Sequence, residues 1–83
     1  MTLELPIYFH TDETQQAHDL ELPYSMEDCE TRMVTFYEIN AVSVYQSKNG
    51  SEYALIHANG DKFISTLSYA EVNARIARAK SVI

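Results

Sequence analysis

Apolar and polar residues alternate along the first part of the chain, and this alternation predicts a β-strand. Every second residue from Leu3 to Phe9 is apolar, and the residues between them include Glu4 and Pro6. A period of two with one apolar side is typical of a strand that lies on a core. Pro6 cannot donate a hydrogen bond to a neighbouring strand, so we expect residues 1–10 to form an edge strand.

Two further segments, Thr31–Tyr37 and Val42–Tyr45, are rich in apolar and β-branched residues. The stretch Glu38–Ala41 between them disturbs the alternation, because it would turn Ile39 outward and Glu38 inward. A β-bulge resolves this conflict, since one extra residue exchanges the two faces of a strand. A short break between two separate strands resolves it equally well.

Two Asn-Gly pairs predict tight hairpin turns, because a two-residue type I′ turn needs positive φ at both central positions. With Asn59-Gly60 as such a turn, Ile56 lies opposite Phe63 and Leu55 lies opposite Ile64. With Asn49-Gly50 treated in the same way, Val44 lies opposite Leu55 and Tyr45 lies opposite Ala54. The polar residues around this first pair also permit a longer loop.

This pairing predicts a sheet with two apolar faces. One face carries Val42, Val44, Tyr53, Leu55 and Ile64, and the other carries Tyr45, Ala54, Ile56 and Phe63. A single helix covers only one face, so the N-terminal segment or a second copy of the protein must cover the other. We therefore take as interface candidates the residues Tyr45, Tyr53, Leu55, Ile56, Phe63 and Ile64.

A helix is predicted over residues 68–82. Ser68 and Glu71 have the spacing of a capping box, and Leu67 and Val72 have that of a hydrophobic staple. Apolar residues then follow at steps of three and four on one helix face. They are Tyr69, Val72, Ile76, Ala79 and Ile83.

The chain is thus expected to be one α+β domain over residues 1–83, with a small antiparallel sheet of three to five strands in residues 32–67 and the C-terminal helix packed on one face. Residues 11–31 form an acidic loop or arm between the edge strand and this sheet. A short helix over residues 13–19, capped by Thr11 or Asp12, and a helical turn at residues 25–29 are the elements predicted there.

Charge is distributed unevenly along the chain. Residues 1–31 carry eight acidic residues and no Lys or Arg, whereas residues 32–83 carry four acidic and six basic residues. The formal net charge is −6, which does not favour nucleic-acid binding. Contact with nucleic acid through Arg75, Arg78 and Lys80 is an alternative, and these bases are equally suited to pair with the acidic arm of the same chain or of a second subunit.

Few residues offer catalytic or metal-binding chemistry. Cys29 is the only cysteine, and its acidic neighbours are expected to raise its pKa. His10, Asp12 and His18 are a further alternative, as a metal or small-ligand site, although their spacing matches no known metal loop. We expect neither an enzyme nor a bound cofactor, and we interpret His57 as a surface histidine.

The N-terminal residues have no basic start and no unbroken apolar run, so we expect no signal peptide. No apolar run approaches the roughly 20 residues of a membrane span. These features predict a cytoplasmic protein that does not interact with membranes.

Residues 39–76 resemble the strand-turn-strand-helix layout of small bacterial FlbD-like proteins and the closing half of LytTR-type DNA-binding domains. They are also similar to short uncharacterised bacterial or phage-borne proteins. The residues that carry this resemblance are Ile39, Val42, Tyr53, Ile56, Asn59-Gly60-Asp61, Phe63-Ile64, Ser68, Glu71-Val72 and Ile76. A LytTR domain implies basic recognition loops, whereas here Lys62 alone stands beside the turn, so no functional residue is carried over.

The leading functional prediction is a non-enzymatic protein-interaction module that forms a homodimer. It follows from the two apolar faces of the sheet and from the six tyrosines, because tyrosine combines a large contact area with a hydrogen-bonding tip.

Overall fold

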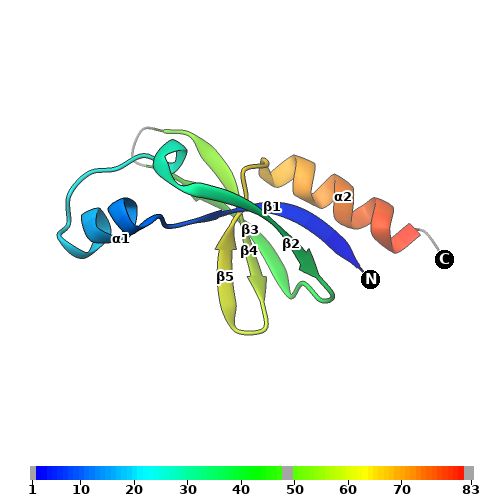
Figure 1. Ribbon diagram of the computed structural model, residues 1–83. Helices are drawn as coiled ribbons and strands as arrows, with labels where there is room; N and C mark the ends of the chain where they lie inside the picture. Colours follow the sequence, from blue (N-terminus) through cyan, green and yellow to red (C-terminus); the bar gives the residue numbers. More distant parts are fainter. Residues whose placement is uncertain (1, 48–49, 82–83) are drawn as a thin grey trace.

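Five antiparallel strands form two sheets, and a C-terminal helix packs against them (Figure 1). This computed structural model describes residues 2–47 and 50–81. The first sheet consists of β1 (Leu3–Phe9) and β2 (Glu30–Phe36), and the second consists of β3 (Ala41–Gln46), β4 (Glu52–Ala58) and β5 (Asp61–Ile64). The helices are α1 (Asp12–Asp19), the 3₁₀-helix η1 (Met26–Asp28) and α2 (Tyr69–Ser81). The predicted α+β class is confirmed.

The two sheets are joined at Ser65, a fully buried residue just after β5. Ser65 forms an isolated antiparallel bridge with Ile7 of β1, and its Oγ donates a hydrogen bond of 2.8 Å to the carbonyl oxygen of Pro6. The same Oγ accepts a bond of 3.1 Å from the amide of Leu67. The other edge of β1 pairs fully with β2. Pro6 therefore takes part in the joint through its carbonyl, although it has no amide hydrogen to donate.

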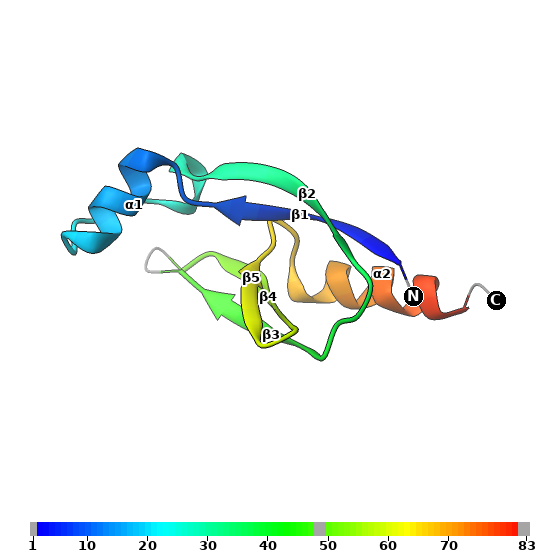
Figure 2. The same ribbon diagram turned by 60° about the horizontal axis from the view of Figure 1, so that its bottom comes forward.

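The hydrophobic core lies between the two sheets and α2. Figure 2 shows the β1–β2 sheet crossing over the β3–β5 sheet, with α2 beside the latter and on the same side of β1 and β2. The edge of the Phe36 ring meets the Phe63 ring at a centroid distance of 5.3 Å, which connects the two sheets. The buried apolar residues are Leu5, Ile7, Phe36, Ala54, Ile56, Ala58 and Val72.

The β4–β5 hairpin has the predicted turn and register. Ile56 pairs with Phe63, and Leu55 pairs with Ile64. Asn59 and Gly60 have φ angles of 54° and 82°, as a type I′ turn requires. Asparagine and glycine tolerate this left-handed backbone better than other residues do, so the local sequence determines the hairpin.

The predicted β3–β4 register is wrong by one residue. Val44 pairs with Ala54 and Tyr45 pairs with Tyr53, where Leu55 and Ala54 were expected. The loop is longer than two residues, because the amide of Ser47 donates to the carbonyl of Ser51 over 2.8 Å. The expected turn residue Asn49 lies outside the described residues. A shift of one residue exchanges the faces of a strand, so Val42 and Val44 lie on the Ile56 face and Tyr45 lies on the Leu55 face.

Between β2 and β3 the structure has a break, which was one of the two predicted solutions. The strands belong to different sheets, and residues 37–40 connect them. The amide of Asn40 donates to the carbonyl of His57, and its side-chain oxygen accepts from the amide of Asn59. The connection is therefore fixed to the β4–β5 hairpin without a bulge.

Helix α2 begins as predicted, one residue after Ser68. The hydroxyl of Ser68 accepts a bond of 3.2 Å from the amide of Glu71, and Val72 is fully buried. Ile76 packs against the core, whereas Tyr69 is exposed. The side chain of Glu71 pairs with Arg75 at 3.3 Å. Ile83, the last residue of the predicted apolar face, lies outside the described residues.

Candidate functional site

The outer face of the β3–β5 sheet, opposite the core, carries a cluster of aromatic and aliphatic side chains. Tyr45 and Tyr53 are cross-strand partners, as are Leu55 and Ile64, and alternation along β4 places both pairs on one face. Tyr8 of β1 joins them, since its ring meets the Tyr53 ring edge-on at 5.5 Å. All five side chains are half-buried. We call the surface formed by Tyr8, Tyr45, Tyr53, Leu55 and Ile64 the tyrosine face.

Four of the six predicted interface residues lie on this face, and two do not. Ile56 points to the opposite side of β4 and is 0% exposed, so its side chain belongs to the protein's own core. Phe63 is paired with Ile56 and packs against the same core. The register shift explains the difference for Tyr45, which was expected to share a face with these two residues.

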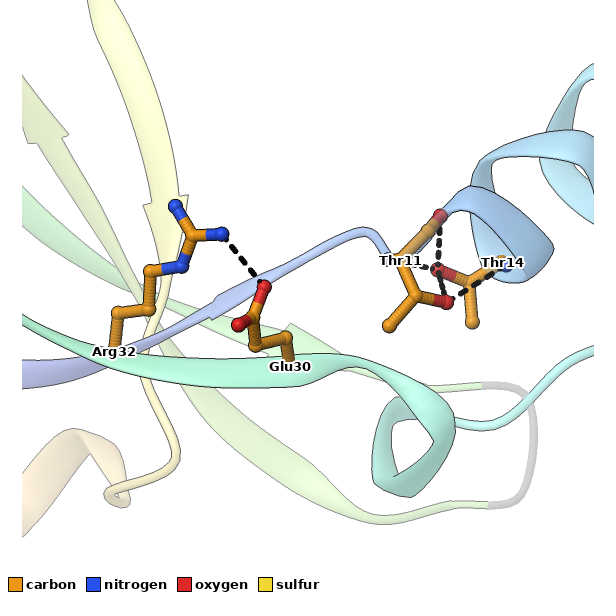
Figure 3. A network of polar contacts seen from close by, with 4 residues as sticks. All are labelled: Thr11, Thr14, Glu30 and Arg32. Atoms are coloured by element: carbon orange, nitrogen blue, oxygen red, sulfur yellow. Dashed lines mark hydrogen bonds and ion pairs between the residues drawn. The ribbon is translucent and has the colours of Figure 1, made fainter.

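Residues 11–31, which we call the arm, begin with a compact turn around Thr14 at the start of α1. Figure 3 shows the hydroxyl groups of Thr11 and Thr14 meeting at the start of α1, near the Glu30–Arg32 ion pair of β2. Thr14 is almost fully buried, and its Oγ1 accepts a bond of 2.7 Å from the amide of Thr11. The Thr11 hydroxyl caps α1 by accepting from the amide of Thr14 at 3.1 Å. This reciprocal cap fixes the first turn of α1.

An aromatic cluster of two histidines and one tyrosine lies between α1 and the following loop. The ring of His10 is 5.5 Å from the ring of His18 and 5.4 Å from the ring of Tyr24. The Tyr24 hydroxyl lies 3.4 Å from Nδ1 of His18, and Nδ1 of His10 lies 3.1 Å from Oγ1 of Thr14. The structure thus brings together two of the three residues of the predicted metal alternative. Within residues 2–47 and 50–81, no cluster of three or more potential metal ligands occurs.

An open cavity of about 770 Å³ separates the arm from the β3–β4 hairpin. We call it the arm groove, and Tyr45 connects it to the tyrosine face. Its acidic side chain is Glu21, and none of the lining residues in the described part of the chain is Lys or Arg. The lining residues are His18, Glu21, Leu22, Pro23, Tyr24, Ser25, Met26, Tyr45 and Ser47.

Glu21 adopts an unusual backbone conformation at the rim of this groove. It directly follows the C-cap of α1 with a φ of 57°, in the left-handed region where glycine is usual. The amides of Glu21 and Leu22 donate to the carbonyls of His18 and Ala17, which closes the helix end in a Schellman motif. A glutamate there costs about 1 kcal/mol relative to glycine, and it places a carboxylate at the groove.

Burial and neighbouring groups perturb three ionisable side chains in this part of the protein. Burial raises the pKa of Tyr8, and the adjacent Tyr53 raises it further. Burial likewise raises the pKa of Tyr24, with Cys29 and Tyr45 adding to the shift. Burial also raises the pKa of Cys29, while a hydrogen bond with Thr14 lowers it and Asp28 raises it. The predicted direction for Cys29 is confirmed, and burial is a larger cause than acidic neighbours.

A serine–histidine contact also occurs on the outer side of the β3–β5 sheet. The Oγ of Ser43 lies 3.1 Å from Nε2 of His57, and both side chains are half-buried. Such a contact is one part of a nucleophilic site. However, neither residue lines the arm groove, and the contact joins neighbouring strands in the manner of a cross-strand pair. We therefore assign it to the structure of the sheet.

The bases of the predicted nucleic-acid alternative lie along the second half of α2. Arg75 pairs with Glu71 on its own helix, and Arg78 and Lys80 are exposed in the last turns. This end of α2 and helix α1 lie at opposite ends of the molecule (Figure 1). The structure therefore does not bring the bases together with the acidic arm of the same chain.

Comparison with known proteins found no family model, no curated protein and no solved structure that matches the chain. The resemblance to FlbD-like and LytTR-type proteins remains a prediction. Within residues 2–47 and 50–81, none of the helices has the length and apolar character needed to cross a membrane.

Tyr8 and Tyr24 were not among the six interface candidates, although all six tyrosines of the chain supported the prediction of an interface. In β1, Tyr8 lies on the side that also carries Glu4 and Pro6, opposite the apolar residues. The bridge between Ile7 and Ser65 places this side of β1 on the outer face of the sheet. The alternation in β1 indicates the outward position of Tyr8 only when the bridge between Ile7 and Ser65 is known. Tyr24 lies in a segment without periodicity, so its place depends on tertiary packing alone.

Proposed function

We propose that this protein is a small interaction module without enzymatic activity that associates with a second copy of itself through the tyrosine face. The observation that carries the proposal is the gathering of Tyr8, Tyr45 and Tyr53 with Leu55 and Ile64 on the side of the sheet away from the core. Aromatic residues are enriched in the buried centres of protein interfaces, where charged residues are depleted.

The size of the chain supports the same proposal. An 83-residue domain buries a smaller share of its surface than a larger one, so association is an effective way to remove apolar area from water. A standard interface buries roughly 800 Å² on each partner, and one tyrosine buries about 150–250 Å². Because the five side chains of the tyrosine face are already half-buried in one chain, they supply the centre of such an interface, and the residues around them supply the rest of its area.

Sedimentation equilibrium of the purified protein tests this function. We expect a mass that rises with concentration from one chain to two chains. In Leu55→Lys the dimer should dissociate about tenfold more readily, because the interface would have to bury an unpaired charge. The matched control is Val44→Lys, which places the same charge on the opposite face of the neighbouring strand, where Val44 is 48% exposed.

Circular dichroism of both variants checks that they fold. A single-chain mass for the unaltered protein at high micromolar concentration contradicts the proposal. An equal effect of the two lysine substitutions would also contradict it, because Val44 lies outside the tyrosine face.

A further inference from the structure

The molecule has an acidic end and a basic end that cannot meet within one chain. The acidic end is the arm with its helix α1, and residues 11–31 include seven acidic residues and no Lys or Arg. The basic end is the second half of α2, where Arg75, Arg78 and Lys80 follow the last acidic residue, Glu71. The molecule is 46 Å long, and Figure 1 places α1 and the C-terminal end of α2 at its opposite ends.

The arm groove is the part of the acidic end with a shape that can receive another element. Tyr24, Tyr45 and Met26 supply aromatic and apolar lining, and Glu21 supplies a carboxylate. Leu22, which also lines the groove, is 54% exposed. A segment that combines cationic side chains with a slender apolar surface would match this lining in charge and in polarity.

Helix α2 has both properties along its length. Its outer side carries the exposed small residues Ala70 and Ala74 in the first half and Ala77 in the second half, at helical spacing, so a partner surface can approach the helix backbone closely. Arg78 and Lys80 follow in the last turns. The helix dipole adds negative charge only at the final carbonyls, so the side chains keep this end positive.

We propose that the arm groove of one copy receives the basic second half of α2 from a second copy, in a two-fold dimer with antiparallel chains. A two-fold axis forms the contact twice, since groove meets helix and helix meets groove. The inference rests on the proposed self-association. Figure 1 shows the C-terminal end of α2 extending past the strands at the end of the molecule opposite α1, where an antiparallel second copy would place its own arm.

Charge reversal tests this contact. Glu21→Lys and Lys80→Glu should each raise the dimer dissociation constant about tenfold, because each acts at both contacts of the two-fold dimer. The double variant Glu21→Lys/Lys80→Glu should restore the dissociation constant to within about threefold of the unaltered value, since opposite charges face each other again. Glu38→Lys is the control, because it reverses an exposed acidic residue in the β2–β3 connection, outside the groove.

Salt supplies a second readout on the unaltered protein. Between about 0.1 M and about 1 M salt the screening length falls from about 10 Å to about 3 Å, so the dimer should dissociate more readily at high salt. Single variants that weaken the dimer, with recovery in the double variant, support the proposal.

The remaining outcomes overturn it in distinguishable ways. A chain that is monomeric under all conditions overturns this inference together with the proposed function. A dimer whose dissociation constant is unchanged by either charge reversal overturns the groove contact alone and leaves the tyrosine face as the interface. Single variants that weaken the dimer without recovery in the double variant contradict the pairing of groove and helix. Masses that grow beyond two chains indicate head-to-tail association and contradict the two-fold arrangement.

Discussion

Ile56 and Leu55 are neighbours on β4, and their side chains lie on opposite faces of the same sheet. Ile56 is 0% exposed and packs in the core with Leu5 and Val72. Leu55 is half-buried on the tyrosine face beside its partner Ile64. Both faces are apolar in sequence, so the difference arises from what the rest of the chain covers. Core residues from β1, β2 and α2 cover one face of this sheet, whereas aromatic side chains, including Tyr8 of β1, form the other.

The largest expected effect compares these two residues directly. Ile56→Ala should lower the free energy of unfolding by about 3 kcal/mol, because it removes buried methyl groups and leaves a cavity among core residues. Leu55→Ala should lower it by about 1 kcal/mol, since a half-buried side chain loses less contact. Urea denaturation at low protein concentration, where the chain is monomeric, measures both values. Equal losses would show that the two faces do not differ as described.

The joint between the sheets is the second way to test the comparison, because it determines which face β1 covers. Ser65→Ala should lower the free energy of unfolding by about 2 kcal/mol, since the half-buried amide of Leu67 loses its acceptor and the carbonyl of Pro6 loses its donor. Thr35→Ala on β2 is the control, as Thr35 is exposed. Amide hydrogen exchange should accelerate at residues 65–67 in the Ser65 variant. A variant as stable as its control would contradict the role given to this joint.

A smaller effect is expected at the helix that covers the core face. Ser68→Ala removes the hydroxyl that caps the amide of Glu71, and it should lower the free energy of unfolding by about 1 kcal/mol. Ser68→Asp keeps an acceptor at the same position and should retain most of the stability. The denaturant midpoints of the two variants give the comparison. An unchanged midpoint in Ser68→Ala would exclude this cap.

The smallest effect concerns the ionisation of the tyrosines. The pKa values of Tyr8 and Tyr24 are raised in the folded chain, chiefly by burial. A raised pKa means that the folded state binds the proton more tightly than the unfolded state does. The resulting stability is complete below the ordinary tyrosine pKa of 10.0 and is lost as pH rises through the higher folded values.

Ultraviolet titration of tyrosinate absorbance is the measurement for this effect. Tyr8→Phe and Tyr24→Phe should each remove a late-titrating group from the titration curve. Six tyrosines that all titrate together near the ordinary value would contradict the burial assigned to Tyr8 and Tyr24.

The sequence predicted those parts of the fold that depend on local backbone chemistry. Asn59-Gly60 determines the β4–β5 register because few other residue pairs accept two positive φ angles. Ser68 determines the start of α2 for a similarly local reason. The β3–β4 register could not be predicted in this way, since polar residues around Asn49-Gly50 allow more than one loop length and both faces of the sheet are apolar.

The candidate site depends more strongly on distant contacts. Tyr45, Tyr53, Leu55 and Ile64 were predicted as interface residues from the excess of apolar surface, and they do share a face. The contact of Tyr8 with Tyr53 and the arm groove were not predicted, because they depend on the Ser65 joint and on the position of the arm beside the β3–β4 hairpin. These contacts join segments that are far apart in the chain, and residue periodicity carries no information about them.

The central claim is that the tyrosine face, and not the core face, is the surface that a second copy covers. Amide NMR spectra recorded from low to high micromolar concentration test it most directly. The account predicts concentration-dependent shifts at Tyr53, Leu55 and Ile64, with none at the exposed Glu38 in the β2–β3 connection. Spectra that are identical at all concentrations, or shifts that avoid these three residues, would contradict it.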